Sequence, residues 1–149
     1  MARYLDEFVI GDTFESDAYA ISLEESLAFA EAYDPQPFHL DEEAAARSMF
    51  RGLASSGWHT AAITMRLIVG SGVLKETGII GTGIDELRWL APVKPGDTLR
   101  VRGEIVEKSP WPGSASRGTL RVKLATFNGE GVVVMTQFAN LIVPQRPPG

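Results

Sequence analysis

The segment from Trp58 to Val69 places the strongest constraint on how this chain folds. Apolar or small residues stand at positions 58, 61, 62, 65, 68 and 69, which is the spacing of one face of an α-helix. The opposite face also carries little charge, because Arg66 is the only charged residue between Trp58 and Leu74. A helix that is apolar on nearly every side is typically buried. We therefore expect other elements to enclose this helix.

After this helix the sequence pattern changes to that of β-strands. Four segments read as strands, namely 81–90, 97–107, 118–127 and 131–143. The last is apolar on both faces, which predicts cover on both sides of that strand. NGEG at 128–131 is typical of a tight hairpin, and 108–118 of a longer flexible loop. Helices followed by antiparallel strands predict an α+β fold whose sheet wraps around the buried helix.

Two shorter helices are predicted before the long one. Ser22 and Glu25 have the S-x-x-E spacing of a capping box, in which each side chain accepts a hydrogen bond from the other residue's backbone. The expected buried face of the helix that follows consists of Leu23, Leu27 and Ala30. Asp41 is positioned to cap a second, alanine-rich helix at 42–48.

The composition and charge of the chain argue against several classes of protein. The chain has 149 residues, 44% hydrophobic and 22% charged, which predicts one soluble globular domain over residues 1–149. The formal net charge of −5 argues against a nucleic-acid partner, because such surfaces need clustered Lys and Arg. The sequence opens without a signal-peptide pattern and has no uncharged stretch near the ~20 residues of a membrane span. We therefore expect a cytoplasmic protein without a membrane partner.

Few residues are available for metal or thiol chemistry. The chain contains no cysteine, which excludes disulfides, thiolate metal sites and cysteine nucleophiles. Its only histidines are His39 and His59, too few for a histidine-rich metal site. Neither a phosphate loop nor a dinucleotide-binding fingerprint occurs. We expect no metal and no bound cofactor.

The sequence YDPQPFHLD, residues 33–41, holds a carboxylate and an imidazole on one stiff turn. Pro35 and Pro37 restrict the backbone between Asp34 and His39, so the turn loses little entropy when it orders. Imidazole exchanges protons near neutral pH, and a nearby carboxylate can orient the ring or hold the same water. The pattern indicates an acid–base pair; the alternative is an Asp that caps backbone amides beside a His that only packs.

A second candidate lies where the long helix begins. The first amides of a helix have no acceptor within the helix and carry partial positive charge. Gly57 lets a ligand carbonyl approach this backbone, which makes its amide a candidate oxyanion donor. The alternative is that Ser56 is only the N-cap and Gly57 only a packing glycine. We expect His59 to be a packing or helix-surface residue.

Together these segments resemble the MaoC-like dehydratases, the (R)-specific enoyl-CoA hydratase family of the hotdog fold. The family motif is close to D-x-N-P-h-H, where h is apolar, followed by an alanine-rich helix and a glycine that opens the long helix. Here the motif reads Asp34, Pro35, Gln36, Pro37, Phe38 and His39, then LDEEAAARSMF and Gly57. The later LRWLAPVKPGDTL resembles the family's strand–turn–strand signature. The resemblance spans roughly residues 21–143.

The resemblance implies a single hotdog domain and an enzyme that hydrates trans-2-enoyl-CoA to (R)-3-hydroxyacyl-CoA, or catalyses the reverse dehydration. Asp34 and His39 match the catalytic pair that activates water. The backbone amide of Gly57 matches the donor that holds the thioester carbonyl. Possible substrate-binding residues are Gln36, Phe38, Ser56 and Trp58.

Two positions depart from the family pattern. Gln36 stands where Asn is usual, which keeps an amide on a longer arm, and Ser56 stands where many members have His. The resemblance also implies a homodimer or higher oligomer, with the site at its interface and the acyl chain in a tunnel beside the long helix. The expected partner is an acyl-CoA or acyl-carrier-protein thioester. The tryptophans are expected in the core, with a pocket wall as the alternative.

Two other functions fit the same residues. A hotdog thioesterase also uses a helix-start amide and a carboxylate, and a non-catalytic subunit would bind acyl thioesters without converting them. The Asp34–His39 pair favours hydration over thioester hydrolysis, whereas the non-catalytic alternative stays open until the pair is replaced. Sequence leaves open the acyl chain length, the carrier, the physiological direction and which member of the pair takes the water proton.

Overall fold

The computed structural model describes residues 3–75 and 77–146, so both ends of the predicted 1–149 domain lie outside the described residues. The strands are β1 Thr13–Glu15, β2 Tyr19–Ala20, β3 Ile80–Trp89, β4 Thr98–Pro110, β5 Arg117–Phe127 and β6 Val133–Pro144. The helices are the 3-10 turn η1 Leu5–Glu7, α1 Leu23–Tyr33, α2 Pro37–Leu40, α3 Glu42–Ala46 and α4 Gly57–Gly70. Among the described residues, no helix is both long and apolar enough to cross a membrane.

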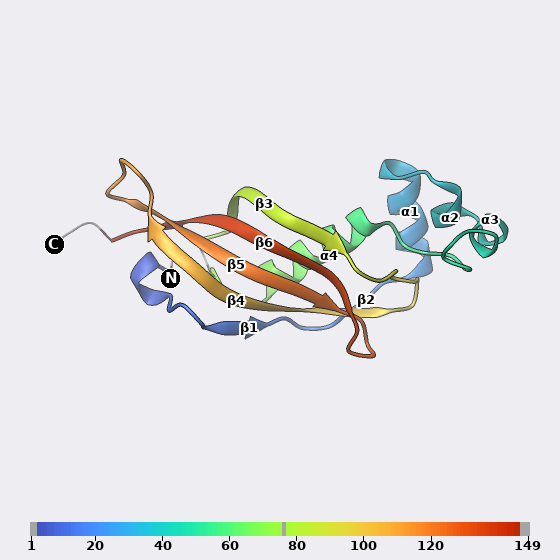
Figure 1. Cartoon of the computed structure of the whole chain (residues 1–149), viewed down its shortest axis with the longest axis horizontal. Helices are drawn as coiled ribbons and strands as arrows, with labels where there is room; N and C mark the ends of the chain where they lie inside the picture. The colour runs from blue at the N-terminus through green and yellow to red at the C-terminus, as the bar shows by residue number, and fades with distance from the viewer. Residues whose placement is uncertain (1–2, 76, 147–149) are drawn as a thin grey trace.

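The strands form one antiparallel sheet in the order β1-β4-β5-β6-β3, and β2 also pairs with β4. The sheet curves over α4, while α1, α2 and α3 gather beyond one end of it (Figure 1). Ile63, Leu67 and Ile68 of α4 share one buried cluster with strand residues such as Val101 and Val122. Burying each such side chain stabilises the fold by roughly 1.5–3 kcal/mol. The α+β class and the wrapped helix are confirmed.

The prediction that α4 is buried on nearly every side is wrong for the single chain. The exposed fractions are 57% for Trp58, 45% for Met65 and 60% for Val69. The buried side includes Thr60 and Thr64 instead. The Thr64 hydroxyl tolerates burial because it donates to Thr60 O at 2.8 Å and pairs with Thr126 Oγ1 at 2.7 Å. The sheet covers one side of the helix and leaves an opposite apolar side open.

The four predicted long strands are present, and two of them extend into the predicted flexible loop. That loop, 108–118, is shorter than expected because β4 continues to Pro110 and β5 begins at Arg117. Ser109 and Thr119 face each other in the ladder, and their hydroxyl oxygens lie 2.9 Å apart. Cross-strand pairing therefore continues past the residues whose Pro and Gly content indicated a loop.

The hairpin between β5 and β6 is confirmed. Asn128 N donates to Val132 O at 2.9 Å, and Gly131 supplies the positive φ of 80° that this reversal needs. The expected cover on both faces of β6 is only partly present, because one face is buried and the other half-buried. On that outer face the Arg121 guanidinium lies 4.5 Å from the centre of the Phe138 ring.

The predicted capping box at the start of α1 is confirmed. Ser22 Oγ accepts from Glu25 N at 3.1 Å, and the Glu25 carboxylate accepts from Ser22 N at 2.9 Å. The predicted buried face is confirmed at Ala30 but wrong at Leu23, which is 47% exposed, because α1 buries Ser26 in its place. The expected cap of α3 is also present: Asp41 Oδ2 accepts a hydrogen bond from the third residue of that helix, at 3.2 Å.

His59 packs between α1 and α4, which agrees with the prediction of a packing residue and not with that of a helix-surface residue. Its ring stacks on Phe29 of α1, with centroids 4.6 Å apart and planes only 4° from parallel. Burial lowers the pKa of His59, and the nearby Glu25 carboxylate opposes this only in part. The neutral ring therefore helps fix α1 against the first turn of α4.

Candidate active site

The candidate site forms where α1 ends, α2 begins and α4 starts (Figure 1). Asp34 is the C-cap of α1, because Pro35 disfavours helical geometry at the residue before it. Pro37 then takes the first position of α2, where its fixed φ favours a helix start. The stiff turn predicted from the prolines therefore includes one helical turn, and that turn carries His39.

Asp34 and His39 lie in direct contact. His39 Nε2 is 3.2 Å from Asp34 Oδ2, and the two side chains are only 6% and 14% exposed. The other ring nitrogen, Nδ1, lies 2.6 Å from Ala54 O. A carbonyl oxygen only accepts, so Nδ1 carries the hydrogen and donates it. In the neutral ring Nε2 is therefore the basic nitrogen, and it faces the carboxylate.

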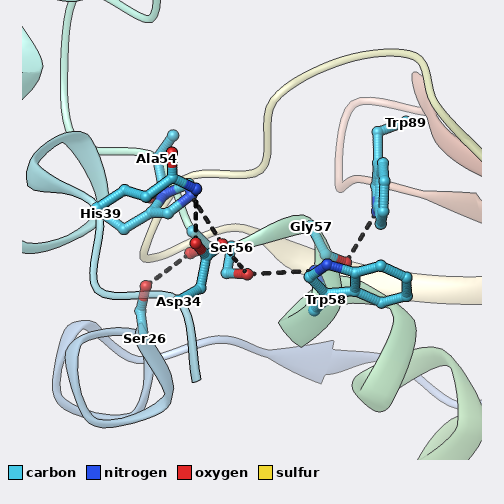
Figure 2. A network of polar contacts seen from close by, with 10 residues as sticks. Ser26, Asp34, His39, Ala54, Ser56, Gly57, Trp58 and Trp89 are labelled. Atoms are coloured by element: carbon cyan, nitrogen blue, oxygen red, sulfur yellow. Dashed lines mark hydrogen bonds and ion pairs between the residues drawn. The ribbon is translucent and has the colours of Figure 1, made fainter. Parts of the chain in front are cut away.

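Two further side chains donate hydrogen bonds to Asp34. Ser56 Oγ donates to Oδ2 at 2.7 Å, a contact visible in Figure 2, and Gln36 Nε2 donates to Oδ1 at 2.6 Å. Burial by itself raises the pKa of Asp34, but the hydrogen bonds from Ser56 and Gln36, with the adjacent His39, hold that pKa below its ordinary value. Asp34 is accordingly an ionised acceptor at neutral pH and a weak base.

The first turn of α4 presents one backbone donor without a partner in the described chain. His59 N and Thr60 N donate to Ser56 O, and Trp58 N donates to Ser56 Oγ. Among the described residues, none accepts a hydrogen bond from Gly57 N. The partial positive charge at the start of the helix adds to the attraction of this amide for a carbonyl oxygen that gains negative charge.

Trp89 explains why residue 57 is glycine. Trp89 Nε1 donates to Gly57 O at 2.8 Å, and a Cβ built on Gly57 would lie only 2.6 Å from two atoms of the indole. Space, rather than a special backbone angle, therefore requires glycine here. Trp89 also packs edge-on against Trp58, with ring centroids 4.9 Å apart. Sequence carried no signal for these contacts, because Trp89 lies 32 positions from Gly57 on another element.

These groups line one cleft of about 460 Å³. Its polar wall includes Asp34, Gln36, His39 and Gly57. Its apolar wall includes Phe38, Phe50, Trp58, Trp89 and Pro92. A second cavity, almost wholly apolar and about 110 Å³ in volume, lies between α4 and the sheet. Trp58 lines both the cleft and this cavity.

Ser56 is placed differently from the other predicted substrate-binding residues. Gln36, Phe38 and Trp58 line the cleft, whereas Ser56 is fully buried and does not line it. The Ser56 hydroxyl lies behind Asp34 instead of against a substrate. In the part of the chain that the structure describes, no three His, Cys, Asp or Glu side chains are grouped to hold a metal ion.

The arrangement combines a basic nitrogen, an ionised carboxylate and a backbone donor around one cleft. Such a set can move a proton at one atom while the amide stabilises negative charge that develops on an oxygen. Addition and elimination beside a carbonyl both need these two functions together.

Comparison with known proteins gives relatives over most of the chain. The family model of the MaoC like domain matches residues 7–126. The uncharacterised Bacillus subtilis protein YdeM is 35% identical over 130 residues, which are 87% of this chain and 91% of YdeM. The crystal structure of a MaoC-like dehydratase from Rhodospirillum rubrum is 44% identical, with a TM-score of 0.92 over 98% of this chain and 99% of that one. The R-hydratase PhaJ1 from Pseudomonas aeruginosa is 29% identical, with a TM-score of 0.75 over 97% and 88%.

These likenesses include every element that builds the cleft. Asp34, His39 and Gly57 all fall inside the matched range 7–126, and the likeness to the Rhodospirillum rubrum structure covers 98% of this chain. The chain therefore belongs to the MaoC-like domain family and has the α+β hotdog fold of its dehydratases.

Proposed function

We propose that this protein adds water across the double bond of a trans-2-enoyl thioester to give an (R)-3-hydroxyacyl thioester, or catalyses the reverse dehydration. The observation that carries the proposal is one cleft that combines Asp34, the basic Nε2 of His39 and the amide of Gly57. The similar solved structures include a MaoC-like dehydratase and an R-hydratase, names that describe the two directions.

In the proposed hydration, a water molecule in the cleft contacts both Asp34 and His39. His39 Nε2 takes a proton from this water as the water oxygen bonds to C3 of the substrate, and the double-bond electrons move onto the thioester oxygen. The Gly57 amide donates a hydrogen bond to that enolate oxygen. The imidazolium then gives its proton to C2 as the carbonyl reforms. One water is added to one face of the double bond, and no co-reactant is needed.

The hydrogen bonds of the pair suggest which member takes the proton. Asp34 has a lowered pKa because Ser56 and Gln36 donate to it, so its carboxylate is the weaker base. His39 donates Nδ1–H to Ala54 O and thereby keeps Nε2 available as the base. In this assignment Asp34 orients the water and stabilises the imidazolium ion that forms.

Asp34→Asn and His39→Gln should each lower the rate of crotonyl-CoA hydration by about 100-fold or more, the usual contribution of a positioned acid or base. Loss of enoyl absorbance measures hydration, and release of free thiol is followed in a separate assay. Asp41→Asn is the matched control, because Asn still caps α3 and residue 41 does not line the cleft. Thermal unfolding confirms that each variant is folded.

Two results of this experiment would reject the proposal. Thiol release without loss of enoyl absorbance would make the protein a thioesterase. Unchanged turnover in both folded variants would make Asp34 and His39 structural residues.

Gly57→Ala should lower kcat for hydration by about 100-fold, which is the lower end of the range for loss of one oxyanion donor. The new Cβ meets the Trp89 indole, so the indole and the backbone at position 57 can no longer keep their present positions together. Gly52→Ala is the control, because a Cβ at Gly52 has nothing within 4 Å. Near-normal kcat in a folded Gly57→Ala protein would contradict the oxyanion role.

We further propose that the apolar cavity between α4 and the sheet receives the far end of the acyl chain. Its volume is about 110 Å³ and its lining is almost wholly apolar. Because an apolar cavity of roughly 150 Å³ binds benzene, this one suits a segment of about four carbons. Trp58 lines both spaces and therefore lies between the reacting carbons and the cavity.

This assignment predicts a preference for short acyl chains. Across enoyl-CoA substrates from crotonyl to dodecenoyl, kcat/KM should fall steeply when the acyl chain exceeds about eight carbons. This length is the sum of about four carbons in the cavity and the remaining carbons, next to the thioester, in the cleft. Trp58→Ala should raise kcat/KM for the long substrates relative to crotonyl-CoA, whereas Trp111→Ala, outside both spaces, should not. An identical chain-length profile for Trp58→Ala and the unaltered protein would contradict the assignment.

We also propose that the protein is a homodimer, for which β3 provides the main support. This strand lies at the edge of the sheet, and Ile80 and Ile84 on it are 58% and 55% exposed. An exposed apolar edge strand favours association with another chain. The open apolar side of α4 adds to the surface that a second copy would cover. Light scattering should give twice the chain mass of 16.2 kDa, and a stable monomer would contradict this.

A further inference from the structure

The hydroxyl group of Ser56 connects the start of α4 to the carboxylate of the candidate pair. Ser56 is fully buried, and its Oγ lies 3.2 Å from Trp58 N and 2.7 Å from Asp34 Oδ2 (Figure 2). The same Oδ2 lies 3.2 Å from His39 Nε2. A single side chain thus caps the helix that presents the Gly57 amide and contacts the carboxylate oxygen nearest the imidazole.

The direction of these hydrogen bonds is fixed by chemistry. Trp58 N only donates, so Ser56 Oγ accepts that bond and keeps its own hydrogen for Asp34. An ionised carboxylate accepts this hydrogen. Such a bond is roughly twice as strong when its acceptor is an ionised carboxylate as when both groups are neutral, so it stabilises the anion relative to the protonated acid. The geometry around Ser56 therefore favours the ionised state of Asp34.

We propose that Ser56 is a positioning residue that holds Asp34 ionised and in register with the oxyanion amide of Gly57. The proposal rests on the proposed hydratase function and goes beyond it, because Ser56 lies behind Asp34 and does not line the cleft. Its hydroxyl ties the carboxylate to the first turn of α4, so the water-binding and carbonyl-binding parts of the site keep one fixed separation.

The protonation of Asp34 distinguishes this positioning role of Ser56 from a role limited to capping α4. Burial raises the pKa of Asp34, and the bonds from Ser56 and Gln36, with His39 as the adjacent titratable group, together lower it. Removing the Ser56 donor should raise this pKa. Activity that needs the ionised carboxylate is lost as pH falls through that value, so the part of the acid limb of the kcat/KM profile that Asp34 sets should move to higher pH.

The test compares Ser56→Ala with Ser56→Thr in the full chain. Ser56→Ala should lower kcat by about 10- to 100-fold, the range for one hydrogen bond to a charged group, with little change in KM. Its acid limb should shift upward. Ser56→Thr keeps both the hydroxyl group and the cap, so it should restore the normal acid limb and most of kcat.

Ser22→Ala is the matched control for helix capping. Ser22 caps α1 through Glu25 N, as Ser56 caps α4, but it makes no contact with Asp34. Ser22→Ala should therefore destabilise the protein without moving the acid limb. Ser56→Gly adds a second check, because glycine is itself an acceptable N-cap but has no hydroxyl; it should shift the acid limb as alanine does.

A direct measurement separates this proposal from the proposed function. NMR titration of the Asp34 carboxyl carbon reports its protonation whether or not the protein hydrates crotonyl-CoA. An upward shift of the Asp34 titration in Ser56→Ala, absent in Ser22→Ala, supports the positioning role. An unchanged Asp34 titration in folded Ser56→Ala would overturn it and leave Ser56 as a helix cap.

Discussion

The position of the α4 N-terminus depends on hydrogen bonds made by the residues just before it. Ala54 N donates to Phe38 O at 3.2 Å, and Ser55 N donates to Val93 O at 2.7 Å. Ala54 O accepts from His39 Nδ1 at 2.6 Å. These bonds tie the helix start to α2 and to the turn before β4. A shift of this segment would change the His39 tautomer, the donor to the carboxylate and the oxyanion amide at the same time.

Neutral donors, more than charge, keep the buried carboxylate ionised. Ser56 and Gln36 both donate to Asp34, and His39 is the adjacent ionisable partner. A permanent cation in their place would also lower the pKa of Asp34, but it would oppose formation of the imidazolium ion beside it. Hydroxyl and amide donors stabilise the anion without that penalty. The chemistry proposed for the site needs an ionised carboxylate next to a ring that is free to gain a proton.

Sequence predicted the parts of this structure that depend on local pattern. The strands followed from their period, and the contact between Asp34 and His39 followed from two prolines within six residues. The exposed side of α4 was missed, because hydropathy does not record that a buried hydroxyl group such as that of Thr64 finds hydrogen-bond partners inside the fold. The packing of Trp89 on Gly57 was also missed, because only the fold brings residues 32 positions apart together.

In the proposed mechanism, one acid–base pair on one side of the cleft takes a proton from water and delivers it to C2 of the substrate. The most direct test is hydration of crotonyl-CoA in D2O, with NMR used to determine where deuterium enters the product and on which face. The account predicts one deuterium at C2, on the same face as the new hydroxyl group at C3, because His39 takes and returns the proton from a single side. Deuterium on the opposite face, or free thiol without a 3-hydroxyacyl product, would contradict it.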